Sequence, residues 1–525
     1  MILFVTFYFS KFFSKYKKIT KIDYLDFNTF PCGQIKLKKN IENGLFRNSY
    51  INQQIHELKI RGNKNLILSL NSLTWLFLLS GINTYNSRKE TEYLFKKSKI
   101  LDCNFSFPEW RPDISGLRLL ALCLNINYLK LINVSSKNNV MAKFLAIHVL
   151  YLNICKFFFT RGLFRLRINM GIFFCSFLLS ELSLKRNKIL KYILKDLNFI
   201  FKNEDKIRNS SDLLEILFYL NRIMKFSSTS DFSNGQLDKK IKTFQNIICP
   251  ILKGLRLGNG LLVRAHESSG FSIYCELEKE LSDAETTNFS IMKNPNGFIR
   301  IKTRRLIFLF DKKTGGQIQK SKDFMCSAFS FAMTSGNNPL IQNNTSFTCY
   351  IGKSDELLFL KNQMNTLGIN IQDDNSNRTD FSSKIIEINH HRDIENNYIE
   401  GQKVISFNEN LVFYNRKLVI PFSGKKIFGE EIISLNRISK KNYFFYLPFF
   451  FHPEVELWKS DHSTNFLLKT KNNEIWRFET DQKNVVLENY RFLDPLDLEI
   501  KNGKRIILFN DFDQKESIFN WKLYQ

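Results

Sequence analysis

The chain has 525 residues, of which 44% are hydrophobic and 24% are charged, a balance typical of a globular protein with two or more domains rather than of a disordered chain. Its 76 Lys and Arg residues outnumber its 50 Asp and Glu residues, and the formal net charge of +26 attracts polyanions such as nucleic acid, anionic lipid or an acidic polysaccharide. A compositional explanation stands beside this one. The 52 Phe residues and the abundant Lys, Asn and Ile are typical of an AT-rich genome, and in that case the charge carries no functional information.

The nine Cys residues form no recognisable framework. They are scattered, no CxxC pair occurs, and most stand in apolar runs such as FFCSFLL. We therefore expect small buried thiols and neither a disulfide framework nor a zinc site. His390, His391 and Asp393 lack the spacing of metal ligands, so we interpret them as surface residues. No nucleotide-binding loop occurs, and no cofactor is expected.

The N-terminal sequence MILFVTFYFSKFF is apolar, but no basic region precedes it and no small-residue cleavage site follows it. We predict an apolar lead segment over residues 1–50 rather than a signal peptide. No other run reaches about 18 uninterrupted apolar residues, so no transmembrane segment is expected. The missing signal and the reduced-looking Cys favour the cytoplasm.

Between residues 51 and 258, apolar residues recur at helical spacing and Pro is nearly absent. The predicted helices are Leu66–Ser80, Lys89–Lys99, Ser115–Asn127, Val140–Phe159, Arg165–Leu182, Lys188–Phe201, Ser211–Phe226 and Lys239–Leu255. Many are apolar on more than one face, as helices buried between others are. Short links favour antiparallel neighbours, so this region is predicted to be a layered array of helical hairpins.

Residues 259–525 change to short apolar runs separated by turn residues, which predicts a large antiparallel β-sandwich. The first predicted strands are Phe271–Glu278, Gly297–Thr303, Arg305–Asp311, Phe324–Thr334 and Ser346–Ile351. The more polar region Ser354–Asn396 is predicted to hold a helix at Asp355–Leu367 and a loop beyond it. Strands resume at Lys403–Ile405, Leu411–Phe413, Lys417–Pro421 and Lys426–Leu435, with hairpin turns at Ser423-Gly424 and Lys471–Glu474.

Several segments stand in a recognisable order along nearly the whole chain. They are LNSLTWLFLL (Leu70–Leu79), WRPDISGLRLL (Trp110–Leu120), RNSSDLLEIL (Arg208–Leu217), ILKGLRLGNG (Ile251–Gly260), SAFSFAMTSG (Ser327–Gly336), Gly429-Glu430, His452-Pro453 and Trp476-Arg477-Phe478. In this order they resemble the heparinase II/III-like family, in particular the bacterial branch associated with alphaproteobacteria. The resemblance implies an α+β multidomain chain, with an incomplete (α/α) toroid of helical hairpins over residues 51–258 and a heparinase II/III-like β-sandwich over residues 259–525.

The chain departs from the family pattern at most of the His residues expected in the cleft. The residues that replace them are Asn71, Asp205, Met325, Asn344, Asn415 and Phe450. His452 is the one that remains. These departures put the catalysis in doubt while leaving the fold expectation in place.

The activity implied by the resemblance is β-elimination from a uronate polymer. Such cleavage needs a group that neutralises the carboxylate, a base that removes the adjacent proton, and an acid for the leaving oxygen. The predicted catalytic residues are His266, Arg264 and Asn209, and the predicted substrate-binding residues are Arg208, Trp110, Arg111, Arg256 and His452. Tyr219 or Tyr274 could replace His266 as the base, although Tyr219 stands inside an apolar helix, where a core role explains it well. Arg208 and His452 have comparable structural explanations, as a helix cap and a core or turn residue.

Three functions follow as hypotheses. The first is a lyase acting on an acidic polysaccharide, which is the expected partner. The second is a catalytically degenerate glycan-binding or envelope-assembly protein on the same scaffold, located in the periplasm or envelope as secreted relatives are. The third is nucleic-acid binding, which rests on charge alone and ranks last because no known module or basic stripe supports it.

Overall fold

In the computed structural model, the described residues are 72–98, 110–132, 138–202, 209–229, 235–264, 276–284, 291–292, 295–313, 319–321, 323–324, 328–344, 364–371, 379–407, 410–436, 443–460, 464–493, 500–511 and 516–525. The predicted lead segment over residues 1–50 lies outside them. The chain divides into two compact units. Unit 1 consists of Met1–Ile207 with Phe271–Glu276 and Pro495–Glu499, and unit 2 of Arg208–Gly270, Leu277–Asp494 and Ile500–Gln525.

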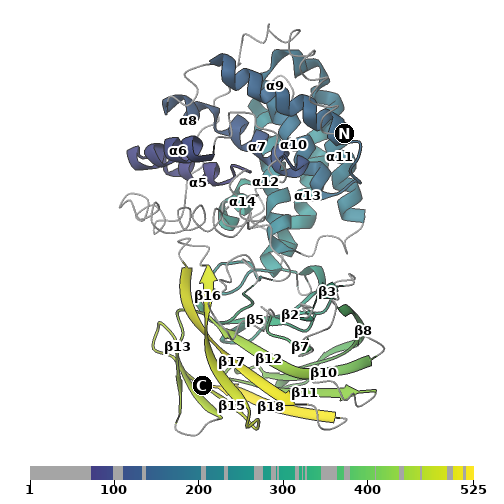
Figure 1. Cartoon of the computed structure of the whole chain (residues 1–525), viewed down its shortest axis with the longest axis vertical. Helices are drawn as coiled ribbons and strands as arrows, with labels where there is room; N and C mark the ends of the chain where they lie inside the picture. The colour runs from purple at the N-terminus through teal and green to yellow at the C-terminus, as the bar shows by residue number, and fades with distance from the viewer. Residues whose placement is uncertain are drawn as a thin grey trace. The chain divides into compact units, whose positions relative to one another are not determined.

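Unit 1 is helical (Figure 1). Its described helices are α5 (Trp75–Ile82), α6 (Tyr85–Ser98), α7 (Pro112–Leu124), α8 (Ile126–Leu131), α9 (Asn138–Cys155), α10 (Leu163–Leu178), the 3-10 helix η3 (Ser180–Lys185) and α11 (Arg186–Lys202). Helices α7 and α10 touch through their backbones, because a Cβ atom on Gly116 would lie 2.6 Å from the carbonyl oxygen of Arg167, and one on Gly171 would lie 2.4 Å from that of Gly116. Both helices are buried along most of their length, as the apolar sequence predicts.

A neutral histidine is fixed inside this unit. The fully buried His148 of α9 accepts a hydrogen bond at Nε2 from Arg118 Nη1 (3.1 Å), so its proton is on Nδ1, which donates to the carbonyl oxygen of Phe144 (3.0 Å). Burial and then the charge of Arg118 lower the pKa of His148 well below its ordinary value of 6.5. A second proton would face the guanidinium, so this packing requires a neutral ring.

Unit 2 contains three described α-helices, α12 (Ser210–Thr229), α13 (Gly235–Gly254) and α14 (Leu277–Asp283), and the 3-10 helix η6 (Pro295–Gly297). Glu280 of α14 accepts hydrogen bonds from Asn221 (2.6 Å) and Arg222 (2.8 Å) of α12, and all three side chains are buried. Asn221 also accepts a bond from Gln245 of α13 (2.8 Å), so one polar group joins the three helices. Within the described residues, no helix of either unit combines the length and apolarity that crossing a bilayer requires.

Two antiparallel sheets make up the rest of unit 2. The first sheet has the order β1-β2-β5-β6-β12-β17-β16, with β7 pairing with both β12 and β4. Its strands are β1 (Phe298–Lys302), β2 (Leu306–Asp311), β4 (Asp323–Phe324), β5 (Phe331–Ser335), β6 (Asn338–Ile341), β7 (Gly368–Ile371), β12 (Tyr443–Phe451), β16 (Val485–Leu493) and β17 (Ile500–Asp511).

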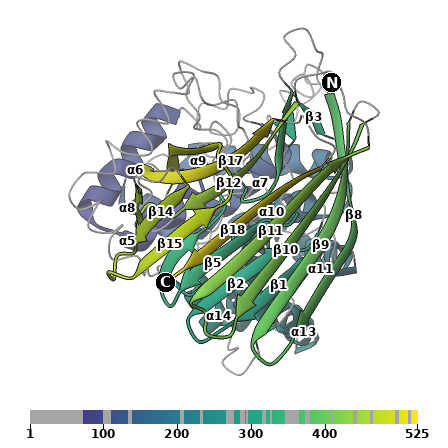
Figure 2. The same cartoon turned by 90° about the horizontal axis from the view of Figure 1, so that it is seen from below.

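The second sheet has the order β13-β14-β15-β18-β11-β10-β9-β8-β3, and Figure 2 shows most of these strands side by side. Its strands are β3 (Gln319–Ser321), β8 (Thr379–Arg392), β9 (Asn396–Phe407), β10 (Asn410–Pro421), β11 (Lys426–Leu435), β13 (Glu456–Lys459), β14 (Asn465–Lys469), β15 (Ile475–Thr480) and β18 (Glu516–Tyr524). Aromatic side chains from both sheets form one core, in which the Trp521 ring stacks on Phe331 with centroids 5.9 Å apart.

The central strand β12 contains a proline, Pro448, at a position where pairing with β7 and β6 needs no N–H group. Pro448 has no N–H group to donate. Pairing of β12 with β7 ends at Tyr446, and pairing with β6 begins at Phe451, so Pro448 falls in the gap between them. The Phe450 amide, also in this gap, donates instead to the side chain of Asn365 (2.6 Å).

The predicted order of a helical region followed by antiparallel sheets is confirmed. The hairpin turns at Ser423-Gly424 and Lys471–Glu474 join β10 to β11 and β14 to β15, with Gly424 at φ +66° and Asn473 at φ +61°. The predicted loop beyond Leu367 is wrong, because β8 runs over Thr379–Arg392 as a polar strand next to the short edge strand β3.

The end of the predicted strand Phe271–Glu278 is also wrong, because Leu277 and Glu278 begin α14. Residues 271–275 of that strand, the predicted strand Ser346–Ile351 and residues 355–363 of the predicted helix Asp355–Leu367 lie outside the described residues, and residues 364–367 are not helical.

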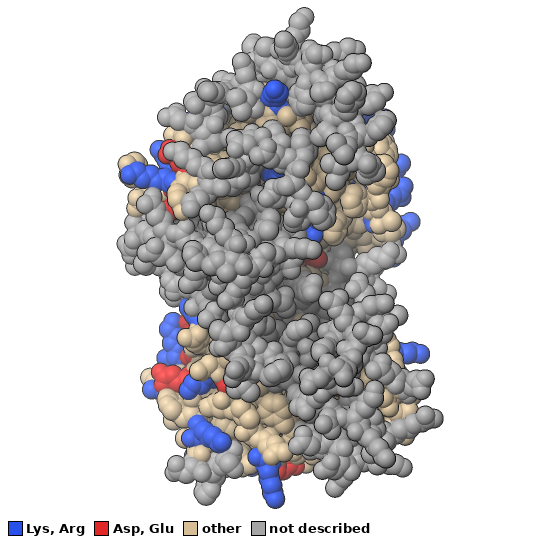
Figure 3. All heavy atoms as spheres, viewed as in Figure 1, with Lys and Arg blue, Asp and Glu red and all other residues tan. Residues whose placement is uncertain are grey.

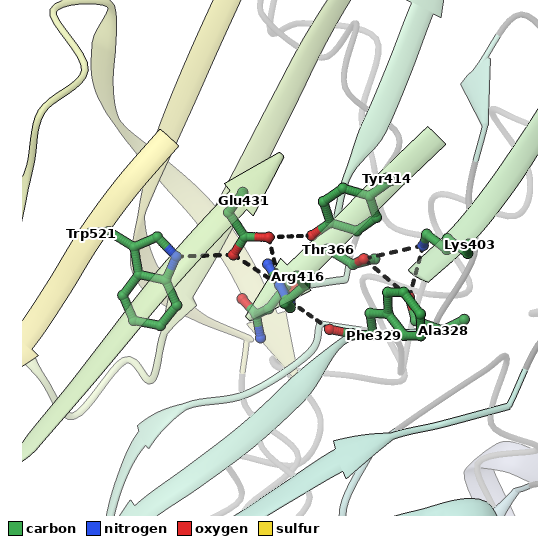
Figure 4. Close-up of polar contacts among 9 residues, drawn as sticks. Ala328, Phe329, Thr366, Lys403, Tyr414, Arg416, Glu431 and Trp521 are labelled. Carbon is green, nitrogen blue, oxygen red and sulfur yellow. Dashed lines mark hydrogen bonds and ion pairs between the residues drawn. The ribbon is translucent and has the colours of Figure 1, made fainter. Parts of the chain in front are cut away.

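A buried charge pair holds the two sheets in register (Figure 4). Arg416 of β10 and Glu431 of β11 face each other across the ladder, with Nε 2.8 Å from the carboxylate and at most 1% of either side chain exposed. The carboxylate also accepts bonds from Tyr414 (2.6 Å) and Trp521 (2.9 Å). Arg416 Nη1 donates to the carbonyl oxygens of Phe329 and Asn365, which precede strands of the other sheet.

Glu431→Gln is predicted to lower the free energy of unfolding by about 3–5 kcal/mol, because it leaves Arg416 as a buried charge without a counterion. Glu430→Gln, one residue earlier on the same strand, is the matched control. Glu430 pairs with Lys417 at 2.8 Å, but the two side chains are 38% and 46% exposed, so its loss is expected to cost below about 1 kcal/mol. Urea denaturation measures both, and equal effects would contradict this account of the pair.

His148 is predicted to make the stability fall as the pH drops below 6.5. The pKa of His148 is lowered in the folded state, so below pH 6.5 the unfolded chain binds a proton that the folded chain does not. The free energy of unfolding therefore falls by up to about 1.4 kcal/mol for each pH unit. Denaturation at pH 7.5, 6.5 and 5.5 should show a smaller decline in His148→Gln than in the unchanged protein. His391→Gln, at an exposed position of β8, should keep the full decline.

Candidate functional site

The segment after α13 supplies two of the predicted site residues, Arg256 and Arg264. It folds back on itself as a tight turn, in which the Leu257 amide donates to the carbonyl oxygen of Leu261 (2.8 Å) and Gly260 adopts φ +85°. Gly258 is required by close packing, since a Cβ atom there would lie 1.9 Å from the carbonyl oxygen of Gly336. The turn therefore fixes the backbone positions of Arg256 and Arg264.

Arg264 is the centre of a group that we name the Arg264 cluster, made of Asn209, Arg264, Asn343, His452 and Phe492. The guanidinium lies over the Phe492 ring, 4.5 Å from its centroid. The backbone carbonyl of Arg264 accepts a hydrogen bond from Asn343 Nδ2 (2.9 Å). Both ends of the residue are thus held by unit 2.

Asn209 reaches the same place through the start of α12. Its side-chain oxygen accepts a hydrogen bond from the amide of Ser211 (2.9 Å), as at the start of many helices. Ser210 then donates to the carbonyl oxygen of Val263 (2.7 Å), the residue before Arg264. This bond places the start of α12 beside the segment that carries Arg264, and Asn209 is only 6% exposed.

His452 also contacts Phe492, with the ring centroids 5.2 Å apart in a T-shaped arrangement. Its Nδ1 accepts a hydrogen bond from the amide of Glu454 (3.2 Å), which orients the ring, and only 4% of the residue is exposed. Tyr490 is also near Arg264, but its hydroxyl donates to the carbonyl oxygen of Phe451 (2.7 Å). Burial raises the pKa of Tyr490 far above its ordinary value, against the opposing charges of Arg264 and Arg505.

The charged group of the Arg264 cluster is the Arg264 guanidinium, and an arginine can bind a carboxylate with two parallel hydrogen bonds. The amide nitrogen of Asn343 already donates to the carbonyl oxygen of Arg264 and to the Ser330 hydroxyl (3.1 Å). The buried phenol of Tyr490 has too high a pKa to act as a base. Among the described residues, no group of three or more His, Cys, Asp or Glu side chains is arranged to hold a metal ion.

Arg256 belongs to a second basic site within unit 2, a cavity of about 560 Å³ that we name the basic pocket. Its charged lining residues are Lys253, Arg256, Glu278, Arg300 and Lys302. Arg256 is 3.0 Å from Glu278, and both are more than 40% exposed. Four cations against one carboxylate give this pocket a positive potential that suits an anionic ligand.

Arg300 is the rigid member of the basic pocket. Its Nη1 donates to the carbonyl oxygens of Gly254 (2.8 Å) and Arg256 (2.5 Å), so it satisfies acceptors at the C-terminal end of α13. Burial, followed by the nearby charge of Arg256, lowers the pKa of Arg300. The sequence prediction missed Arg300 and Lys302, because alternating Arg and Lys in the strand FIRIK resemble any solvent-facing strand residues.

Trp110 and Arg111 belong to unit 1, where they lie at the start of α7. Trp110 is 7% exposed and packs against His148 with ring centroids 4.4 Å apart. Arg111 binds Asp113 through two hydrogen bonds of 2.6 and 2.8 Å. Tyr219 is 1% exposed, and its hydroxyl donates to Glu215. Arg208, His266 and Tyr274 lie outside the described residues.

No family model matches this chain, and no curated protein matches its sequence. Solved structures do resemble it. A heparinase III structure has a TM-score of 0.54 at 9% sequence identity, and the match covers 96% of this chain and 80% of that one. The heparan sulfate lyase HepC from Pedobacter heparinus matches 99% of this chain and 87% of its own, at 9% identity and a TM-score of 0.46. The first of these likenesses shows that the chain has a heparinase III-like fold, with helices followed by two antiparallel sheets.

Proposed function

We propose that this protein is a carbon–oxygen lyase that cleaves an acidic, uronate-containing polysaccharide by β-elimination. The observation that carries the proposal is the Arg264 cluster. In it, Arg264 and His452 both contact the Phe492 ring, and Asn209 precedes Ser210, whose hydroxyl binds the residue before Arg264. The heparinase III-like fold agrees with this assignment.

In the proposed reaction, Arg264 binds the uronate carboxylate and withdraws charge from it, with Asn209 beside it. Neutralising the carboxylate makes the proton on the adjacent carbon more acidic. A base removes that proton, the bond to the leaving oxygen breaks as an acid, a protonated side chain or water, protonates that oxygen, and a double bond forms in the sugar ring. We assign proton removal to His266, two residues after Arg264 in the chain, because the described phenols of Tyr219 and Tyr490 are buried and hydrogen-bonded.

A second candidate function is binding of the same polysaccharide without cleavage, as a glycan-binding or envelope-assembly protein. It is favoured by the burial of His452, whose Nδ1 already accepts a backbone hydrogen bond. Nucleic-acid binding stays in third place. Among the described residues on the face drawn in Figure 3, the blue Lys and Arg side chains are scattered, whereas binding along a phosphate backbone needs a stripe of cations.

Arg264→Gln is predicted to lower kcat/KM at least about 100-fold, as expected when a group that stabilises developing charge is removed. The measurement is the ultraviolet absorbance of the unsaturated uronate formed from polygalacturonate, alginate and heparan sulfate. Arg304→Gln, at an exposed position of the turn between β1 and β2, is the matched control and should keep full activity.

Binding of all three polymers by the unchanged protein without any unsaturated product would contradict the lyase proposal and support the second candidate. Full activity in both Arg264→Gln and Arg304→Gln would remove Arg264 from the reaction.

The basic pocket is predicted to contribute polymer binding rather than chemistry. Arg256→Gln should raise KM about fivefold with little change in kcat, since it removes an attraction present equally in the ground state and the transition state. Glu278→Gln is the opposite-charge control and should lower KM, because it removes the one carboxylate among the described lining residues. The same direction of change in both variants would contradict a charge-based role.

A further inference from the structure

The outward face of the second sheet is more apolar than a solvated sheet face normally is. Residues alternate along its strands, so that one set enters the core and the other faces solvent. The outward set includes several large apolar side chains, of which Trp458 is 47% exposed and Ile475 is 58% exposed. Exposed apolar groups that gather on one surface commonly mark a binding site.

The strand register places five outward-facing side chains, some apolar and some basic, in one row across the strands. Trp458 of β13 pairs with Leu467 of β14, which pairs with Arg477 of β15. Arg477 pairs with Tyr524 of β18, and Tyr524 pairs with Lys426 of β11. We name this row the outer strip; Figure 2 shows β14, β15, β18 and β11 running side by side. Neighbouring strands are about 4.8 Å apart, so the strip is about 19 Å long.

The charge of the outer strip is positive, because it contains Arg477 and Lys426 and no acid. Among the described residues, neither of these two cations forms an ion pair. The two bordering rows are charge-balanced instead. On one side Glu456 stands opposite Lys469, and on the other Glu479 is 2.5 Å from Lys522 and accepts a hydrogen bond from Tyr524 of the strip.

We propose that the outer strip binds a single extended chain of an acidic polysaccharide, at a place made of none of the residues of the Arg264 cluster or the basic pocket. The exposed Trp458 ring offers a flat apolar surface with a polar edge, which suits the apolar face of a sugar ring. The Tyr524 ring is held in place by Lys522, whose Nζ is 5.2 Å from its centroid, and by its hydrogen bond to Glu479. The exposed guanidinium of Arg477, between Leu467 and Tyr524, binds a carboxylate or sulfate group of the same chain. The ligand class rests on the proposed function, whereas the location rests on the register and the exposure.

The shape of the outer strip favours this ligand over a membrane. An anionic bilayer is flat and would meet the charge-balanced rows on either side together with the strip, so most of its contact would bring no net attraction. A polymer one sugar wide follows the row and meets only its two rings, Leu467 and the two cations. The row thus suits an extended chain that lies across the strands.

The test measures binding by titration calorimetry with polygalacturonate of defined length, neutral dextran and phosphatidylglycerol vesicles. The variants are Trp458→Ser, Arg477→Gln and the double variant. The matched controls are Ile386→Ser and Lys384→Gln, both exposed on β8 of the same sheet. We expect about fivefold weaker polygalacturonate binding in each single variant and at least about tenfold in the double variant, with little change in the controls and no binding of dextran.

Unchanged polygalacturonate binding in the double variant would overturn the proposal. Vesicle binding that the double variant abolishes would also overturn it and would assign the strip to a membrane. A change in the oligomeric state of the double variant, measured by sedimentation, without loss of glycan binding would overturn it too and would assign the strip to a second copy of the chain. The result is independent of the lyase proposal. A protein that binds polygalacturonate through the strip but forms no unsaturated product would contradict the proposed cleavage alone.

Discussion

The buried pair of Arg416 and Glu431 is the constraint on which the sandwich depends. A charge pair taken out of water is costly unless its remaining hydrogen-bonding capacity is also used. Here the carboxylate is bound by Tyr414 and Trp521, and Nη1 of the guanidinium by backbone carbonyls of the other sheet, while Nη2 is the one buried nitrogen of the pair without a bond among the described residues. One of these carbonyls belongs to Phe329, whose φ of +72° is unusual for a residue with a bulky side chain. Arg416 therefore holds a strained turn and both sheets in a single arrangement.

The same hydrogen bonds continue from the core to the Arg264 cluster. Arg416 donates to the carbonyl oxygen of Asn365 (2.8 Å), and the side-chain amide of Asn365 donates to Asn343 (3.1 Å). Asn343 in turn donates to the carbonyl oxygen of Arg264 (2.9 Å). Each amide satisfies buried groups that have few alternative partners, which favours one position for each. The backbone of the proposed carboxylate-binding arginine is thus fixed by a chain of contacts that begins at the centre of the sandwich.

The sequence could predict those helices and strands in which apolar residues face the core on one side. The alternation in β9, β10, β11 and β18 is visible because their inward residues are apolar, whereas β8 carries polar residues such as His390 and His391 and was mistaken for a loop. Arg264, Asn209 and His452 were predicted through the family resemblance, since their spacing alone says nothing of their meeting. Phe492 and Asn343 were missed, because an aromatic ring and an amide acquire their roles only through tertiary contacts that no local pattern contains.

The location of the cations, rather than their number, connects this structure to a function. Arg416 and Arg300 serve buried acceptors and contribute little to the field that a ligand meets, although both count toward the net charge of +26. Arg256 and Arg477 face solvent beside apolar surface, where they can recognise an anionic group. A composition-driven excess of lysine would place cations without regard to such neighbours. At the basic pocket the positive charge coincides with a cavity, and at the outer strip it coincides with apolar side chains. This coincidence supports the proposed binding of an acidic polysaccharide better than a generally basic composition does.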